Sequence, residues 1–299
     1  MLIGPGDDAA IVRVSDGRVV VSTDLLVEGQ HFRRDWSTAY DVGRKAAAQN
    51  LADILAMGAV PTALVVGLAA PADLEVGWVD GLTDGLRDEC ARLRVSVVGG
   101  DLSASSALVV AVTALGDLRG RSAVTRSGAQ PGDVVVVAGR LGFAAAGLAL
   151  LQAGRVDHPL ADAHRVPEVA YDAALRLADA GATAMVDVSD GLVADLGHIA
   201  AASGVRIELA SDDLPLPPEL VEAALALGVD PRSWVAGGGE DHAFAATMRS
   251  DAALRAVTLL ADLDAPVPFA QVGRVVAGGP GVVFVDETPA GPTGHQHFA

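Results

Sequence analysis

The stretch that decides the fold is TAMVDVSDGLVADLGHIAAASGVRIEL, residues 183–209. Its opening segment, 183–188, is short and apolar and predicts a buried strand, whereas 192–203 predicts a helix and 205–209 a second strand. Asp187 and Asp190 flank Val188-Ser189 where the first strand gives way to the helix, and Gly191 follows. Because ligand sites of α/β proteins lie at strand ends, these two carboxylates are candidate site residues.

The same alternation of strands and helices extends through both halves of the chain. In the C-terminal half we predict strands at 134–138, 243–248, 270–275 and 282–285, and helices at 141–153 and 169–180. In the N-terminal half we predict a hairpin of strands 9–14 and 18–23, helices at 39–57 and 74–93, and strands at 62–68, 95–98 and 108–115. Thr38 and Asp41 form a predicted capping box. The turn-rich stretch 126–133 marks a boundary between domains 1–126 and 127–299.

The composition limits the classes of function. Of 299 residues, 51% are hydrophobic, which allows a sizeable core, and the one cysteine, Cys90, excludes an internal disulfide and favours a reducing compartment. The net charge of −17 argues against nucleic acid or an anionic membrane as a partner. The uncharged stretch 54–72 approaches bilayer-spanning length, but two glycines and two prolines interrupt it, so we interpret it as a helix end followed by a buried strand. We expect a soluble, cytoplasmic protein.

Carboxylates recur beside glycines and other small residues along the whole chain. They comprise Asp7-Asp8 after Gly6, Asp24, Asp53, Asp101 after Gly99-Gly100, Asp187, Asp190, and Glu240-Asp241 after three glycines. Any one of these motifs is usually a turn or a helix cap. Together they indicate several Mg²⁺ ions, because converging carboxylates repel one another unless cations lie between them, and Mg²⁺ prefers carboxylate and phosphate oxygens.

Several familiar phosphate-binding and catalytic motifs do not occur in the sequence. Lys45, its one lysine, follows Arg44 rather than a glycine-rich loop, so a Walker-type loop is excluded. Neither the protein-kinase motifs nor a Gly-x-Ser-x-Gly elbow occurs. Phosphoryl transfer by this chain would therefore depend on metal ions, arginines and backbone amides.

Eight motifs resemble those of the thiamine-monophosphate kinase family and occur in the family's order. They are 6–10, 22–24, 28–32, 50–59, 99–101, 125–133, 187–192 and 238–241. The resemblance implies an α/β fold of the α+β type with two domains, shared with aminoimidazole ribonucleotide synthetase and selenophosphate synthetase. In that fold an N-terminal sheet domain forms a homodimer and a C-terminal α/β domain follows.

The resemblance also implies a reaction and its residues. ATP would phosphorylate the phosphate of thiamine monophosphate by direct in-line transfer, giving thiamine diphosphate. Metal ligands would be Asp8, Ser22, Thr23, Asp24, Asp53, Asp101, Asp187 and Asp190; ATP contacts would be Gly100, Asp101, Arg126 and Ser189; substrate contacts would be His31, Glu240 and His295; and Asp24, Asp53, Asp101 and Arg126 would be catalytic.

Other interpretations stay open at this point. His31 suits a structural role as well as a substrate contact, and either His295 or Phe298 could replace the aromatic residue that the family tends to carry near its C-terminus. We interpret His158, His164 and His198 as structural or surface residues. Five residues precede Gly6, where the family carries a helical segment, which leaves a truncated chain or a miscalled start.

Two alternative functions are weighed against the kinase. The first is another ATP-using enzyme of the same superfamily; a selenophosphate synthetase would need a reactive cysteine or selenocysteine beside a lysine, a pair that the sequence lacks. The second is a catalytically inactive nucleotide-binding module, which the presence of every implied carboxylate disfavours.

Overall fold

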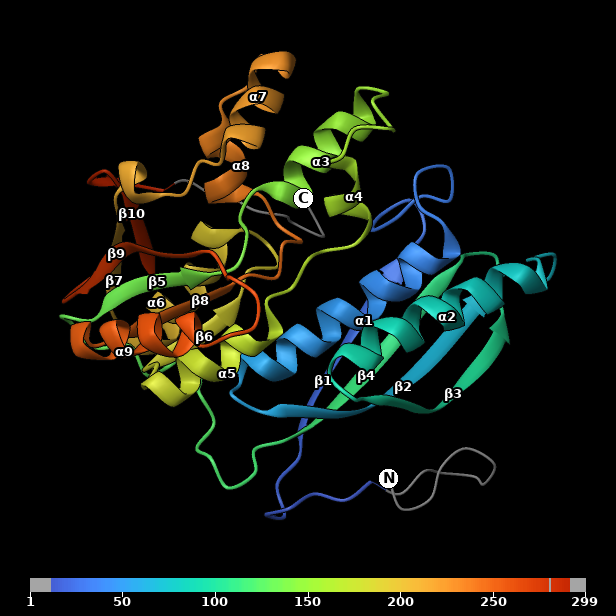
Figure 1. The fold of residues 1–299 in the computed structure, drawn as a ribbon, viewed down its shortest axis with the longest axis horizontal. Coiled ribbons are helices and arrows are strands. Elements are labelled where there is room, and N and C mark those ends of the chain that lie inside the picture. Colours follow the sequence, from blue (N-terminus) through green and yellow to red (C-terminus); the bar gives the residue numbers. More distant parts are fainter. Residues whose placement is uncertain (1–11, 280, 291–299) are drawn as a thin grey trace. The chain divides into compact units, whose positions relative to one another are not determined.

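The computed structural model describes residues 12–279 and 281–290, and its chain divides into two compact units. The first unit ends at Ser122, and the second begins at Ala123 and also includes the short segment Ala56–Gly58. Each unit contains its own sheet and its own covering helices (Figure 1).

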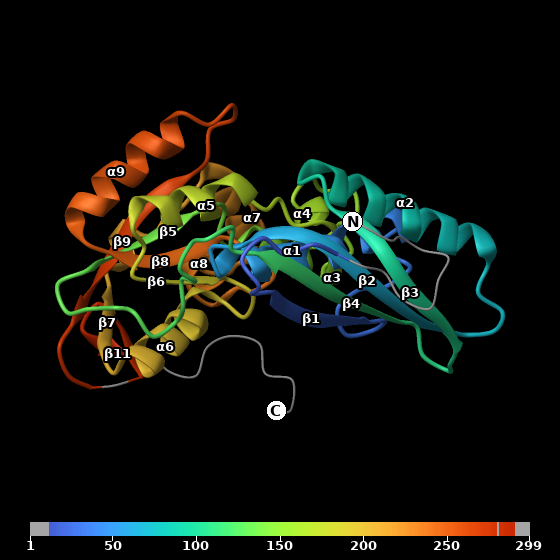
Figure 2. The same ribbon diagram turned by 90° about the horizontal axis from the view of Figure 1, so that it is seen from below.

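The first unit is a four-stranded sheet with two helices on one face. Its elements are β1 (Val20–Val27), α1 (Ala39–Ala56), β2 (Val60–Ala70), α2 (Val76–Arg92), β3 (Ser96–Ala104) and β4 (Val109–Asp117). The strand order is β1-β4-β2-β3, with β2 and β3 parallel and the other pairs antiparallel. Helices α1 and α2 lie side by side over one face (Figures 1 and 2). Val110, Val112 and Ala114 of β4 alternate toward that face and are buried.

The opposite face of this sheet is open and apolar. Val21 and Leu25 of β1 are each 55% exposed, and Val65 of β2 is 38% exposed. A contiguous apolar face of this kind on a sheet favours association with another surface.

Glycines allow α1 and α2 to pack with their backbones in contact. A Cβ atom at Gly85 would collide with the carbonyl oxygen of Tyr40, and one at Gly43 would collide with that of Leu82. The completely buried carboxylate of Glu89 joins the two helices, because it pairs with Arg44 of α1 at 2.7 Å and Arg92 of α2 at 2.6 Å. A buried carboxylate is tolerated because its charge is compensated by these two guanidinium groups.

The second unit is a seven-stranded sheet with helices on both faces. Its elements are β5 (Val134–Ala138), α3 (Phe143–Gln152), α4 (Ala161–Arg165), α5 (Tyr171–Ala180), β6 (Ala184–Asp187), α6 (Leu192–Ser203), β7 (Arg206–Leu209), η1 (Ser211–Asp213), α7 (Pro218–Leu227), α8 (Pro231–Gly237), β8 (Phe244–Met248), α9 (Ser250–Ala261), β9 (Phe269–Val276), β10 (Val282–Val285) and β11 (Thr288–Pro289). The strand order is β11-β10-β7-β9-β5-β8-β6. Helices α5 and α9 pack together on one face and α6 lies on the other (Figure 2).

The core of the second unit is aliphatic. All five residues of β5 are buried, and the cluster that packs against them consists mainly of Ala, Val, Leu and Ile. Phe143 and Trp234 are its aromatic members among the described residues. Burial of small side chains on both faces of a strand produces the continuous apolar run seen in the sequence.

The predicted hairpin at the start of the chain is wrong in its described part. Residues 12–14 are not in a strand, and β1 instead pairs along its whole length with β4, Val20 opposite Gly116 and Val27 opposite Val109. The Ser15 backbone and hydroxyl both donate to the Asp117 carboxylate, at 3.0 and 2.9 Å. The predicted turn is therefore bonded to the end of β4. Residues 9–11 lie outside the described residues.

Other predictions about the elements are confirmed or extended. The stretch 54–72 is the end of α1 followed by β2, and within the described ranges no helix combines the length and apolar character needed to cross a bilayer. Thr38 and Asp41 form the capping box, with the Thr38 backbone donating to Asp41 at 2.8 Å and the Asp41 backbone donating to Thr38 at 3.2 Å. Asp24 and Asp101 lie inside β1 and β3, not at strand ends, because both strands continue beyond their predicted limits.

Replacement of Gly85 by alanine tests the close helix contact. The added methyl group would force α1 and α2 apart, and overpacking of this kind lowers the free energy of unfolding by about 1–3 kcal/mol. Gly77→Ala in the same helix is the control, because a Cβ there meets no atom within 4 Å and alanine favours the helix. Urea unfolding should show Gly85→Ala destabilised and Gly77→Ala unchanged or more stable; equal stability of the two variants would contradict the packing.

Candidate functional site

Three predicted metal ligands of the first unit lie together between β1 and α1. The Ser22 hydroxyl donates to the Asp53 carboxylate at 2.6 Å. The backbone N–H of Asp24 donates to the Asn50 side chain at 3.1 Å, and the Asn50 amide donates to the carbonyl of Ala46 at 2.9 Å. Ser22 and Asp24 share the helix-covered face of β1, while Asn50 and Asp53 are one turn apart on α1. The local geometry therefore holds oxygen ligands of the kind that Mg²⁺ prefers.

Thr23 does not join this group through its hydroxyl. It lies on the open face of β1, where the hydroxyl donates to the carbonyl of Val112 at 3.0 Å and is 3.1 Å from the hydroxyl of Thr113. Alternation along a strand places neighbouring side chains on opposite faces. The side chains of Ser22 and Thr23 therefore lie on opposite faces of β1, and the role of Thr23 as a metal ligand stays a prediction.

Asp101 and Gly100 are also separated from this group within the sheet. In the sheet, Asp101 lies opposite Gly67, Gly67 opposite Ala111, and Ala111 opposite Leu25. The side chain of Asp101 therefore projects from the open face, where it is exposed. Gly100 is aligned with Asp24 across the sheet, but strands β2 and β4 lie between the two residues. Three strand spacings amount to roughly 14 Å. The sheet therefore does not bring Asp101 to the metal ligands of its own β1 and α1.

The loop after β1 fixes the ring of His31. Its Nδ1 accepts the backbone N–H of Val27 at 3.0 Å, and its carbonyl oxygen accepts a hydrogen bond from the buried Lys45 Nζ at 3.0 Å. Because Nδ1 is an acceptor here, a neutral imidazole carries its proton on Nε2. His31 can thus present a hydrogen-bond donor to an anionic group.

In the second unit two predicted motifs run side by side beyond the ends of β6 and β8. The backbone N–H of Val188 donates to Ala243 at 2.7 Å, that of His242 donates to Val188 at 2.9 Å and that of Glu240 donates to Ser189 at 2.8 Å. A Cβ atom at Gly239 would collide with the carbonyl oxygen of Ser189. Glycine at this position therefore allows the two loops to approach.

Two histidines contact predicted site residues. His164 was interpreted from the sequence as a structural or surface residue, and His242 was not among the predicted site residues. His242 Nδ1 lies 2.9 Å from the Asp187 carboxylate, and both side chains are buried. His164 Nδ1 lies 3.2 Å from Glu240 Oε2. Glu240 and His242 both have left-handed backbones, with φ of 68° and 51°, which is uncommon for residues other than glycine. Strained backbone of this kind clusters at functional sites.

Asp241 is buried against the beginning of α3. Its carboxylate accepts the backbone N–H groups of Gly142 at 2.5 Å and Ala144 at 2.8 Å. Burial raises the pKa of Asp241 to about 7, although these two N–H groups act in the opposite direction. The side chain thus anchors the loop that carries Glu240 and His242.

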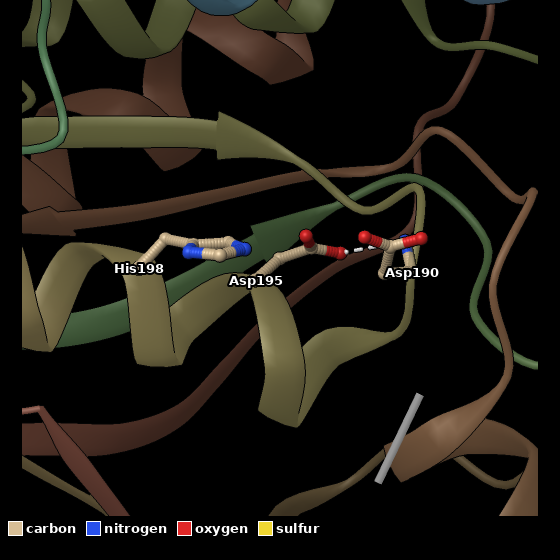
Figure 3. A group of neighbouring side chains, drawn as sticks. All are labelled: Asp190, Asp195 and His198. Carbon is tan, nitrogen blue, oxygen red and sulfur yellow. Dashed lines mark hydrogen bonds between the residues drawn. The ribbon is translucent and has the colours of Figure 1, made fainter. Parts of the chain in front are cut away.

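Asp190, Asp195 and His198 bring their ligand atoms within 4.8 Å of one another (Figure 3). Asp195 and His198 project from α6, and Asp190 lies in the loop before it (Figure 3). Burial is the main cause that raises the pKa of Asp195 to about 7, and repulsion from the Asp187 charge is the second cause. The two carboxylates suit a hard cation such as Mg²⁺, whereas the exposed imidazole of His198 suits it less.

The remaining predicted residues differ in which of their groups could contact a ligand. Arg126 has an exposed side chain, and its carbonyl oxygen accepts the Ser203 hydroxyl at 2.9 Å. The backbone N–H and carbonyl of Ser189 both make hydrogen bonds, so its hydroxyl is the group suited to a ligand. Burial raises the pKa of Cys90 to about 12, so its thiol is a poor nucleophile. Asp8 and His295, like Phe298, lie outside the described residues.

Comparison with known proteins places these features in a family. Residues 6–118 match the N-terminal domain of AIR synthase related proteins, and residues 130–286 match the C-terminal domain. The thiamine-monophosphate kinase of Mycobacterium tuberculosis is 50% identical over 303 residues, which covers 100% of this chain and 86% of that protein.

Solved structures agree with the sequence comparison. The crystal structure of thiamine-monophosphate kinase from Stenotrophomonas maltophilia has a TM-score of 0.86 at 36% identity and covers 97% of this chain and 92% of that one. The structure described as AaThiL complexed with AMPPCP and TMP has a TM-score of 0.84 at 35% identity, with coverages of 94% and 87%. The predicted resemblance and fold class are confirmed: this chain belongs to the thiamine-monophosphate kinase family, and its two halves are AIR synthase related domains.

Proposed function

We propose that this protein transfers the γ-phosphoryl group of ATP to the phosphate of thiamine monophosphate and so forms thiamine diphosphate. The observation that carries the proposal is the relative described in complex with AMPPCP and TMP, which has the same fold at 35% identity. The carboxylates of this chain support it, because Asp53 and Asp187 are each held by a hydrogen bond in the manner of preorganised metal ligands.

The chemistry of the acceptor explains why no general base is needed. A phosphate oxygen is already ionised at pH 7, whereas a hydroxyl acceptor benefits from a group that removes its proton. The obstacle is the mutual repulsion of two anions that must meet in line. Bound Mg²⁺ ions would supply the neutralising charge. The residues that would hold them are Asp24 and Asp53 in the first unit and Asp187 and Asp190 in the second.

The protein's own groups would orient the reactants. The Nε2–H of His31 would donate to the acceptor phosphate, and the carboxylate of Glu240 would face the cationic thiazolium or the aminopyrimidine. The guanidinium of Arg126 would bind ATP phosphates with two parallel hydrogen bonds, a geometry that an ammonium group lacks. The γ-phosphoryl group passes directly to the acceptor oxygen as the bond to the β-phosphate breaks, so no phospho-enzyme forms.

The choice of acceptor is the test of the proposed function. Thiamine and thiamine monophosphate are offered separately with γ-labelled ATP and Mg²⁺, and the products are separated by chromatography. Label should appear in thiamine diphosphate and not in the protein, because the acceptor attacks the γ-phosphorus itself. Efficient phosphorylation of free thiamine, or a labelled enzyme on the path of turnover, would refute the mechanism.

Nucleotide binding should require a divalent cation. At an effective dielectric constant of 20, two like charges 4 Å apart repel by about 4 kcal/mol, equivalent to roughly a thousandfold in affinity. Calorimetry should therefore detect AMPPCP binding with Mg²⁺ and at least about a hundredfold weaker binding in EDTA. Asp24→Asn and Asp53→Asn should impair turnover and keep the fold, whereas Asp172→Asn, an exposed change on α5, should impair neither. Undiminished binding in EDTA would refute the metal-bridged site.

The same titration tests Arg126. Arg126→Lys keeps the charge but loses the planar fork, so affinity for Mg²⁺–AMPPCP should fall roughly tenfold. Arg176→Lys on α5 is the matched control and should bind as the wild type does. If both lysine variants bind equally well, Arg126 does not make a bidentate contact.

We also propose that the protein is a homodimer that buries the open face of its first sheet. Sedimentation at micromolar concentration should give the mass of two chains. Val65→Glu, which places a charge in the middle of that face, should produce monomers, whereas Val76→Glu, a 76% exposed valine of α2, should not. A wild-type monomer, or a dimer that tolerates Val65→Glu, would exclude this face as the interface.

A further inference from the structure

A single carboxylate oxygen organises the loop between β6 and α6. Asp195 Oδ2 accepts the backbone N–H groups of three consecutive residues, Ser189 at 3.0 Å, Asp190 at 3.0 Å and Gly191 at 3.1 Å. The Asp195 side chain is buried, with 2% of the residue exposed. Figure 3 shows it reaching back from the first turn of α6 toward the backbone of Asp190.

Convergent N–H groups at a helix N-terminus ordinarily form an anion site. Here the protein's own carboxylate fills that site, so these three amides are not available to a phosphate group. Negative charge at the beginning of the helix is also favoured by the helix dipole. A ligand phosphate at this loop would therefore be met by cations and side chains, and the Ser189 hydroxyl rather than its N–H would contact it.

The position of this loop determines where two proposed metal ligands lie. Asp187 is fixed on one side by His242, and Asp190 lies three residues later, between the bonded amides of Ser189 and Gly191. Without an acceptor for these amides, the buried N–H group of Gly191 and the partly buried ones of Ser189 and Asp190 would lose this partner, which is costly. The bonded loop is thus set in place before any ligand binds.

We propose that Asp195 is a positioning residue that holds the 189–191 loop so that the Asp187 and Asp190 carboxylates keep the spacing needed to bind a divalent cation. The inference rests on the proposed function only in naming that cation as part of a kinase site. Asp195 acts through the three amides that its Oδ2 accepts.

The competing explanation is that Asp195 is only a helix cap, whose loss lowers stability and nothing else. Asp133 offers a matched control, since it is another buried carboxylate, 3% exposed, that accepts the Gln130 N–H at 3.0 Å and the Thr183 hydroxyl at 2.7 Å. It lies toward the opposite end of the strands, because Val134, which follows it, pairs with Met248 at the last residue of β8, whereas Asp187 pairs with Phe244 at the first.

The experiment compares Asp195→Ala, Asp195→Asn and Asp133→Ala with the wild type. Amide hydrogen exchange at residues 189–191 is measured in the metal-free protein, and the affinity for Mn²⁺ alone is measured by electron paramagnetic resonance. In Asp195→Ala, exchange should be at least roughly tenfold faster and Mn²⁺ affinity at least roughly tenfold lower, since about 1.4 kcal/mol corresponds to a factor of ten. Asp195→Asn should keep the slow exchange, because its amide oxygen can accept the same three N–H groups. Asp133→Ala should lower the unfolding temperature and change neither quantity.

The proposal is overturned if Asp195→Ala matches Asp133→Ala in exchange and Mn²⁺ affinity, or if Asp195→Asn exchanges as fast as Asp195→Ala. Should Asp195→Ala not fold, Asp195→Ser replaces it, with the same expected losses. Neither readout uses ATP or thiamine monophosphate. A failure of the proposed kinase activity would therefore leave this result standing, and a failure here would leave the activity untouched.

Discussion

The candidate site of the second unit depends on the close approach of two backbone segments, 188–191 and 237–243. Two glycines allow that approach: a Cβ at Gly239 would collide with the Ser189 carbonyl oxygen, and one at Gly191 would lie 2.6 Å from the Gly237 carbonyl oxygen. The left-handed φ of 121° at Gly191 also disfavours any other residue. The contact between Asp187 and His242, and the position of Glu240, follow from this approach.

Acidity is the second constraint on the molecule. With a net charge of −17, the chain still buries several carboxylates, and it stabilises them in different ways. Glu89 pairs with two arginines, Asp187 lies against His242, and Asp241 accepts N–H groups at the beginning of α3. Asp24, Asp53 and Asp190 are half-buried. Carboxylate oxygens of this kind would suit Mg²⁺, and bound Mg²⁺ would offset the repulsion between two phosphates in the proposed reaction.

Local signals in the sequence predicted much of the fold. The bounds of α6, β5 and β10 were predicted to the residue, and the Thr38–Asp41 cap has the expected bonds. The hairpin prediction failed because the partner of β1 is β4, which lies far along the chain and offers pairing over the full strand. The separation of Asp101 from Asp24 follows from strand order and register, which no local pattern encodes.

The residues that sequence reasoning missed act through long-range or loop-dependent contacts. Asp195 looks like an ordinary acidic residue in the first turn of a helix, and its triple hydrogen bond exists only once the preceding loop has its shape. His242 directly follows Glu240-Asp241, so the motif pointed to its neighbourhood, but its partner Asp187 is distant in sequence. His164 was interpreted as structural or surface because nothing near it in sequence suggests Glu240.

The central proposal is that cations held by the carboxylates would neutralise the charge of the donor and acceptor phosphates. The most direct test is electron–nuclear double resonance on the Mn²⁺-loaded protein with AMPPCP, with and without thiamine monophosphate. The account predicts ³¹P couplings from the nucleotide and an additional ³¹P coupling when thiamine monophosphate is added, both weakened by Asp187→Asn. A spectrum with nucleotide couplings alone, unchanged by thiamine monophosphate and by Asp187→Asn, would contradict it.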